Sequence, residues 1–186
     1  MKSNIVNNLM VPVSEYGTVS EEATLYEAVM ALEKAQKEWD QTRYPQRAVL
    51  VYDNTDRIVG KLSQFDVIRS MEPKYEEIGD HISLSRFGYN PLDMKSLLNE
   101  YKLWHKPLND ICRKGAKMKV KAFMYTPTEG EFVDENATLD EAIHQLIMGR
   151  HQSLLVTQGK EKEIVGILRK TDVFAEISEV IKTCNL

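Results

Sequence analysis

Two stretches decide the fold, VSEEATLYEA at residues 19–28 and VDENATLDEA at residues 133–142, because they repeat one segment. Seven of their ten positions are identical. A second pair, IVGKLSQFDV at residues 58–67 and IVGILRKTDV at residues 164–173, shares six of ten. The first pair is offset by 114 residues and the second by 106, so repeat one carries eight extra residues between its two segments. Repetition on this scale indicates one supersecondary unit used twice.

Composition narrows the class of protein. Each repeat has about 60 residues, a size that buries little surface alone, so we expect the two copies to pack on one another. The 186-residue chain is 28% charged and 42% hydrophobic, as is typical of soluble globular proteins. Its net charge of −4 gives the surface no general attraction for nucleic acid. No signal peptide or membrane-length apolar run is present, and the two cysteines fit a reducing compartment, so we expect a cytoplasmic protein.

Sequence motifs for catalysis and metal binding are missing. The two cysteines and four histidines have no zinc-ligand spacing. There is no glycine-rich phosphate loop and no nucleophile elbow. We therefore expect neither an enzyme nor a bound metal.

The repeated unit reads strand, helix, strand, strand, helix. Thr24 and Thr138 are each followed three residues later by glutamate, Glu27 and Glu141, which is the capping-box signature of a helix start. Apolar residues follow at helical spacing in both copies. Two short runs rich in Val, Ile and Leu come next, joined by the polar connections DNTDR and QGKEKE, and predict a hairpin. The final helices are predicted over residues 64–71 and from residue 170 or 171 to 181.

The segment between the copies, residues 73–117, does not belong to the repeat. Asn90 followed by Pro91 predicts a helix near residues 91–105. It carries an apolar stripe formed by Met94, Leu97, Leu98, Tyr101 and Trp104. This helix either packs on the sheet edge as a connector or presents a surface to a partner. The stretch RKGAKMKVK at residues 113–121 has five basic residues in nine, and is either a solvated linker edge or a patch for phosphate groups.

The turns GKLSQFD at residues 60–66 and GILRKTD at residues 166–172 could carry chemistry. Glycine allows a ligand or a neighbouring strand to approach the backbone closely. Ser63 is placed where a strand ends and a helix begins, a position that favours an anion. Asp66 could accept both hydroxyls of a ribose, although Ser-x-x-Asp is also an ordinary capping box. The recurrence of this turn in both copies favours a ligand.

These features together resemble a tandem pair of CBS domains, over roughly residues 5–72 and 118–182. The resemblance implies an α+β fold of two pseudo-symmetric repeats packed sheet against sheet. It implies two clefts between the repeats that bind adenosine-containing ligands such as AMP, ADP or ATP, with S-adenosylmethionine or a cyclic dinucleotide as other options, and no required cofactor. In such modules the motif Asp holds the ribose, phosphate lies near the motif Ser or Thr, and adenine lies against the opposite repeat. A homodimer is also implied.

Transferred to this chain, the resemblance gives two sets of nucleotide-binding residues. The first cleft would use Ser63, Asp66, Ala137, Gln152 and Ser153. The second would use Asp172, Ala23, Gln46 and Arg47, with Arg169 replacing the expected hydroxyl. The proline usual in the second strand is also absent, since Leu50 and Val156 stand there. Because an arginine is not a small neutral cap, although it could pair with phosphate, the first cleft is the better candidate.

The leading hypothesis is a regulatory, ligand-sensing module that signals to a separate effector protein. An alternative is a module that binds no ligand, dimerises through its helical faces and holds a partner through the inserted segment. A third hypothesis, nucleic-acid binding through residues 113–121, lacks a supporting motif and is opposed by the overall acidity.

Overall fold

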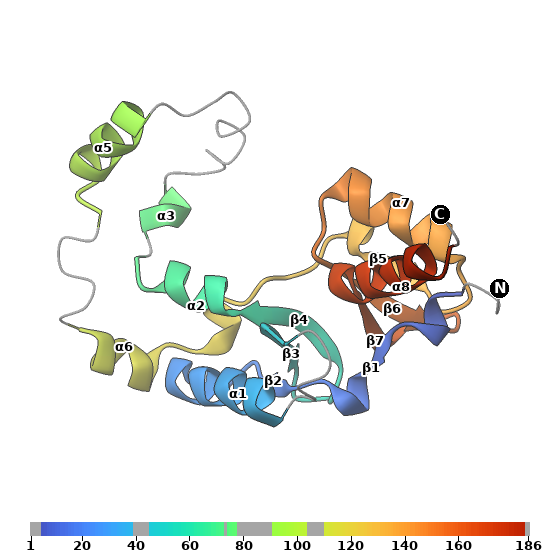
Figure 1. The fold of residues 1–186 in the computed structure, drawn as a ribbon. Coiled ribbons are helices and arrows are strands. Elements are labelled where there is room, and N and C mark those ends of the chain that lie inside the picture. The colour runs from blue at the N-terminus through green and yellow to red at the C-terminus, as the bar shows by residue number, and fades with distance from the viewer. Residues whose placement is uncertain (1–4, 39–44, 73, 78–90, 104–109, 185–186) are drawn as a thin grey trace.

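The computed structural model describes residues 5–38, 45–72, 74–77, 91–103 and 110–184. Figure 1 shows a mixed helix-and-sheet fold with a sheet in each half of the chain, which confirms the expected α+β class. None of the helices in the described residues combines the length and the apolar character that a membrane span requires.

The two halves are built from the same elements in the same order. The first half contains β2 (Thr18–Ser20), α1 (Leu25–Glu38), β3 (Ala48–Tyr52), β4 (Ile58–Ser63) and α2 (Gln64–Ser70). The second half contains β5 (Phe132–Asp134), α7 (Leu139–Gly149), β6 (Ser153–Gln158), β7 (Glu163–Arg169) and α8 (Lys170–Thr183). In each half the first two strands are parallel and the last two are antiparallel. The predicted strand, helix, strand, strand, helix order is therefore confirmed in both copies.

Capping boxes start the first helix of each half, as predicted. The Glu27 carboxylate accepts from the backbone N–H of Thr24 at 2.6 Å, and the N–H of Glu27 donates back to the Thr24 hydroxyl at 3.3 Å. Thr138 and Glu141 make the same pair of bonds at 2.9 and 3.3 Å. These bonds satisfy backbone N–H groups that the first helical turn leaves without partners.

The short segments that precede the halves are exchanged between them. The N-terminal segment carries a 3-10 turn, η1 (Val6–Asn8), and the strand β1 (Val11–Pro12), which pairs antiparallel with β7 of the second half. The segment before the second half carries η3 (Val120–Ala122), and its Tyr125 bridges Lys61 on β4 of the first half. The two exchanges correspond, since the N–H of Val6 donates to the carbonyl of Ala137 at 3.0 Å and that of Val120 to Ala23 at 2.9 Å.

The exchange extends into the hydrophobic cores. Val120 and Phe123 are buried in the core of the first half, beside α1 and the β2–β3–β4 sheet. Val6 is buried in the core of the second half. A third cluster joins the two sheets, and we call the region around it the seam; its buried members are Val11, Tyr16, Leu50, Leu155 and Ile167. Each half therefore completes its core with residues that precede the other half.

The glycine of each repeated turn is explained by this exchange. A Cβ atom at Gly60 would lie 2.9 Å from the carbonyl oxygen of Tyr125, and one at Gly166 would lie 2.9 Å from that of Val11. Such a separation is too short for a side chain to be tolerated without a backbone shift. Of the two close approaches expected from sequence, that of a neighbouring strand is the one observed here.

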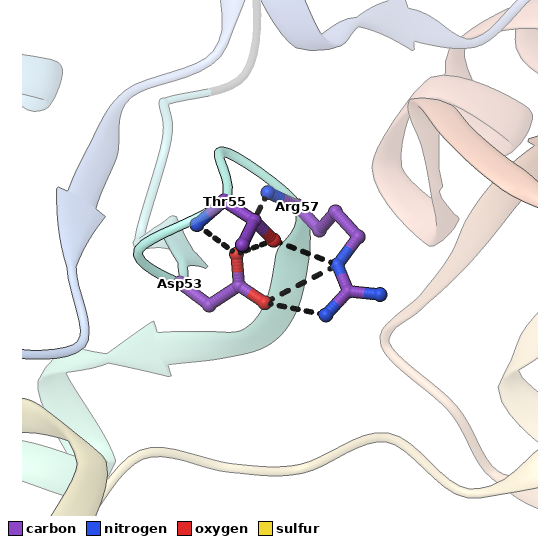
Figure 2. A network of polar contacts seen from close by, with 3 residues as sticks. All are labelled: Asp53, Thr55 and Arg57. Carbon is purple, nitrogen blue, oxygen red and sulfur yellow. Dashed lines mark hydrogen bonds and ion pairs between the residues drawn. The ribbon is translucent and has the colours of Figure 1, made fainter.

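The hairpin between β3 and β4 is closed by the predicted polar connection. One oxygen of Asp53 accepts from the N–H and the hydroxyl of Thr55, at 2.8 and 2.7 Å, and from the N–H of Arg57 at 3.1 Å (Figure 2). The Thr55 hydroxyl is the main reason that the pKa of Asp53 is lowered to about 2. The turn at residues 53–57 sets the residue at which β4 begins. It thereby also sets the position of the repeated turn GKLSQFD, which lies at the end of β4.

The inserted segment contains α3 (Lys74–Glu77), α5 (Pro91–Glu100) and α6 (Ile111–Lys117). The predicted helix is present as α5, but Figure 1 shows it apart from both sheets, so the expected packing on the sheet edge is not observed. Leu98 of the predicted stripe is 41% exposed, and Trp104 lies outside the described residues. The Lys74 ammonium of α3 donates to the carbonyl of Tyr101 at 3.0 Å, which connects the residue after α5 to α3.

The basic stretch at residues 113–121 lies along the first half. The Lys121 ammonium pairs with Glu22 at 2.7 Å, and Lys119 donates to the Glu22 carbonyl at 2.6 Å. Lys114 donates to the carbonyl of Met71. Three of the basic side chains therefore hold the linker against the first half, which agrees with a linker edge better than with a phosphate patch.

Candidate functional site

The first repeated turn places a buried carboxylate at the end of β4. Ser63 caps α2, and Asp66 stands on the first helical turn with 7% of its surface exposed. One Asp66 oxygen, Oδ2, accepts from the Ser63 N–H at 2.8 Å and from its hydroxyl at 2.6 Å. Within the described residues, the other oxygen, Oδ1, accepts no hydrogen bond. The predicted capping box is present, and it leaves one carboxylate oxygen of Asp66 as an acceptor for a ligand.

Beside this turn, a polar cluster connects the first half to the segment that leads into the second. The Lys61 ammonium on β4 pairs with the Glu131 carboxylate at 2.6 Å, and their side chains are 13% and 3% exposed. The same ammonium lies 3.5 Å from the Ser153 hydroxyl and 5.2 Å from the centre of the Tyr125 ring. Lys61 therefore reaches across the seam to three groups from the other part of the chain.

The electrostatics of this cluster favour an ionised Glu131. Burial alone would raise the pKa of Glu131, but hydrogen bonds from Lys61 and Tyr125 hold it below its ordinary value. The pKa of Tyr125 is raised to about 12, first by burial and then by its hydrogen bond to Glu131. The charge of Asp66 contributes to the same rise, which places Asp66 close to the cluster. We call Lys61, Ser63, Asp66, Tyr125, Glu131 and Ser153 the first site.

The second repeated turn is arranged differently. The Arg169 guanidinium donates through Nε to Asp172 Oδ2 at 2.6 Å and through Nη2 to Oδ1 at 2.5 Å. Both side chains are buried, and both Asp172 oxygens are occupied by this fork. Tyr16 lies beside the pair, and burial raises its pKa to about 12. We call Tyr16, Arg169 and Asp172 the second site, in which the motif carboxylate is already paired with a guanidinium.

Among the described residues, no hydrogen bond or ion pair links the remaining predicted residues of the second cleft to Asp172. Gln46 is buried, and its amide accepts from the Gly17 N–H and donates to the Glu15 carbonyl, both at 3.3 Å. Arg47 is exposed. Ala23 lies at the start of α1, where its carbonyl accepts from Val120. Gln46 is thus engaged in holding the turn before β2.

Strand pairing also shifts the correspondence between copies by one residue. Ala48 pairs with Ser63 as Ser153 pairs with Arg169, so Ala48 and Ser153 are equivalent. The equivalents of Gln152 and Ser153 are therefore Arg47 and Ala48, where the sequence comparison gave Gln46 and Arg47.

Of the second-half residues predicted for the first cleft, Ser153 belongs to the first site, because its hydroxyl contacts Lys61. Gln152 accepts from the Lys170 ammonium at 2.6 Å and lines a separate groove of about 390 Å³ between α7 and α8. Ala137 is half-buried, and its carbonyl accepts from Val6. The structure thus brings Ser63, Asp66 and Ser153 to one region.

Sequence reasoning missed Lys61, Tyr125, Glu131 and Tyr16. One signal was available, because Lys61 stands where the second copy of the motif has Ile167. The partners of Lys61 could not be found from sequence, because they depend on the exchange of the leading segments. Over the described ranges, no group of three His, Cys, Asp or Glu side chains could hold a metal ion.

Comparison with known proteins identifies the fold. The family model described as CBS domain matches residues 120–179. No curated protein sequence matches the chain. CBSX2 from Arabidopsis thaliana, a CBS-pair protein, is similar in structure with a TM-score of 0.61 and 15% identity over 98% of this chain and all of that one.

Two further solved structures are similar. A structure of CBSX2 in complex with AMP has a TM-score of 0.57 and 16% identity, over 95% of this chain and 98% of that one. The CBS domains of a transcriptional regulator from Streptococcus pneumoniae give 0.54 and 12%, over 92% and 97%. The resemblance stated from sequence is confirmed: the chain carries a CBS domain at residues 120–179 and has the fold of a tandem CBS-domain pair.

Proposed function

We propose that the protein is a regulatory module that binds an adenosine-containing nucleotide at the first site and signals to a separate effector protein. AMP, ADP and ATP are the candidate ligands. The AMP complex of a structurally similar CBS-pair protein supports this assignment. So does the regulatory character of such modules, which are not catalytic in general.

The observation that carries the proposal is the state of Asp66. Its carboxylate is buried at the end of a strand, and Oδ1 is available while Oδ2 holds the helix cap. Ribose hydroxyls are donors that such an oxygen would accept, and a buried acceptor gains more from being satisfied than an exposed one. Asp172, the equivalent residue, differs because both of its oxygens already accept from the Arg169 guanidinium.

Binding at the seam provides a mechanism for signalling. A ligand held by Asp66 of the first half and by Ser153 of the second contacts both halves. It shifts the population of two arrangements only if it binds one of them more tightly. The effector would then recognise the favoured arrangement.

Titration calorimetry with AMP tests the assignment. We expect Asp66→Ala to abolish binding, with a cost to stability on the order of 1 kcal/mol from the lost cap. The matched control is Glu141→Ala. Glu141 has the same position in the capping box of α7 as Asp66 has in that of α2, but it lies outside the first site. Retained affinity in Asp66→Ala would reduce Asp66 to a cap and refute the ribose assignment.

A specific observation favours self-association as a second function. Phe174, Ile177 and Ile181 of α8 are 59%, 41% and 57% exposed, and their spacing places them on one face of the helix. Ile147 and Met148 of α7 are also exposed. Apolar faces of this kind mark association surfaces, so we propose that a second copy of the chain covers them.

Analytical ultracentrifugation tests the homodimer. The wild type should sediment as a dimer, and Phe174→Asp should sediment as a folded monomer. Glu176→Ala, a charge removed from the same helix, serves as the control. A wild type that is monomeric at every concentration would remove the second function and leave the first untouched.

A further inference from the structure

Among the described residues of the first site, Lys61 supplies the positive charge, and its ammonium is already paired. Its partner Glu131 is almost fully buried and lies 2.6 Å away. The other Glu131 oxygen, Oε1, accepts from the Tyr125 hydroxyl and from the Thr128 N–H at 3.2 Å. The carboxylate is therefore fixed from two sides, and Lys61 is held against it.

The fold itself does not require this cluster. Lys61 bridges Tyr125 just as Ile167 pairs with Val11 on the opposite side of the seam. By the same offset as the repeated segments, Glu131 corresponds to Gly17. The equivalent region is therefore built with Val, Ile and Gly in place of a tyrosine, a lysine and a glutamate. The second site has its own buried pair, Arg169 and Asp172, but nothing there corresponds to Lys61 and Glu131, so this pair distinguishes the first site from the second.

The position of Lys61 suggests which ligand group it affects. Lys61 and Ser63 are two residues apart on β4, so their side chains leave the sheet on the same face. The ammonium also lies 3.5 Å from the Ser153 hydroxyl of the second half. It therefore stands between Ser63 and the opposite half, where its positive charge would attract the phosphate of a nucleotide held by Asp66.

A phosphate that reached Lys61 would have to share the cation with Glu131. A buried carboxylate that loses its paired cation pays a large desolvation cost, so the phosphate would gain little. Asp66 adds a second negative charge nearby. Each further phosphate brings more negative charge toward two carboxylates and one lysine.

We propose that Glu131 is a specificity-determining residue of the first site: by holding Lys61, it favours adenosine ligands of low phosphate charge over di- and triphosphates. This inference rests on the proposed function, because it narrows the ligand class of the same site. It assigns Glu131 and Lys61 as one unit, with Tyr125 positioning the carboxylate.

The test measures affinities for adenosine, AMP and ATP by titration calorimetry. The wild type should bind ATP no more tightly than adenosine. In Glu131→Gln, Lys61 is released while the amide can still accept from Tyr125 and Thr128, so the ratio of ATP affinity to adenosine affinity should rise by about tenfold or more. Adding Lys61→Met to Glu131→Gln should abolish that rise. An unchanged ratio in Glu131→Gln would overturn the proposal.

Two further variants make the result specific. Glu179→Gln removes the carboxylate of an exposed pair with Lys182 that has the same 2.6 Å separation, and should leave the ratio unchanged. Tyr125→Phe keeps every charge and removes one donor to Glu131, so it should raise the ratio in the same direction by a smaller factor. This variant decides the question if Glu131→Gln does not fold, because an unchanged ratio in folded Tyr125→Phe would then overturn the proposal.

Inorganic pyrophosphate separates failure of this inference from failure of the proposed function. If no variant binds adenosine, the nucleotide assignment fails. The inference still predicts that Glu131→Gln binds pyrophosphate more tightly than the wild type and that the double variant does not. Equal pyrophosphate affinity in all three proteins would refute the role of Glu131 independently of any nucleoside.

Discussion

Val120 provides a direct test of the exchanged architecture. It precedes the second half in sequence, but its side chain is fully buried in the core of the first half. Val120→Ala removes two buried methyl groups, worth about 0.8 kcal/mol each, and leaves a cavity that the neighbours fill only in part. We therefore expect the free energy of unfolding to fall by about 2–3 kcal/mol in urea denaturation.

The location of the damage is the sharper readout. Hydrogen exchange followed by mass spectrometry should show faster exchange first in residues 18–63, which contain the β2–β3–β4 sheet. Val6→Ala is the mirror control, because Val6 is fully buried in the core of the second half, and should act first on residues 132–169. If Val120→Ala instead loosened residues 132–169 and left the first half protected, the exchange of segments would be refuted.

Three other perturbations have defined outcomes. Gly60→Ala should lower the free energy of unfolding by about 1–3 kcal/mol, because its Cβ would meet the Tyr125 carbonyl. The control Gly115→Ala, which has open space around it in α6, should not destabilise the protein. Equal effects of the two substitutions would contradict this prediction. Burial raises the pKa of Tyr16 to about 12, so the stability that Tyr16 contributes is full below pH about 10 and is lost as pH rises toward 12. Tyr16→Phe should reduce this loss of stability in urea denaturation at a series of pH values. An unchanged pH profile would count against the prediction. Deleting residues 91–106 should leave the melting temperature nearly unchanged, since α5 stands apart from both sheets, and aggregation of the deletion variant would show that α5 is needed by the core.

Much of the fold could be predicted because its signals are local. The capping boxes at Thr24 and Thr138 mark the first helix of each half, and the repeated glycine turns mark where the hairpins end. The predicted order of elements follows from these signals and the apolar spacing between them. Each signal depends on neighbours only a few residues away.

The exchange could not be predicted, because it depends on partners far apart in sequence. The stretches around Val6 and Val120 are too short to carry a period, and nothing in them states which core they enter. The consequence reaches the candidate site, since Tyr125 and Glu131 meet Lys61 only through this exchange.

Arg169 shows a second limit of sequence reasoning. The sequence allowed its guanidinium to pair with a phosphate, but the carboxylate three residues later occupies it. For Gln46, the strand pairing shows that the residue equivalent to Gln152 is the next one, Arg47. The alignment of two such short repeats could not place its gap to within one residue.

The central claim is that a ligand is held between the two halves by residues of both. Hydrogen exchange in the presence and absence of saturating AMP measures this most directly. The account predicts that AMP protects residues 60–67 and residues 151–158 together, with protection of both lost in Asp66→Ala. Protection confined to one half, or to α7 and α8 alone, would contradict it.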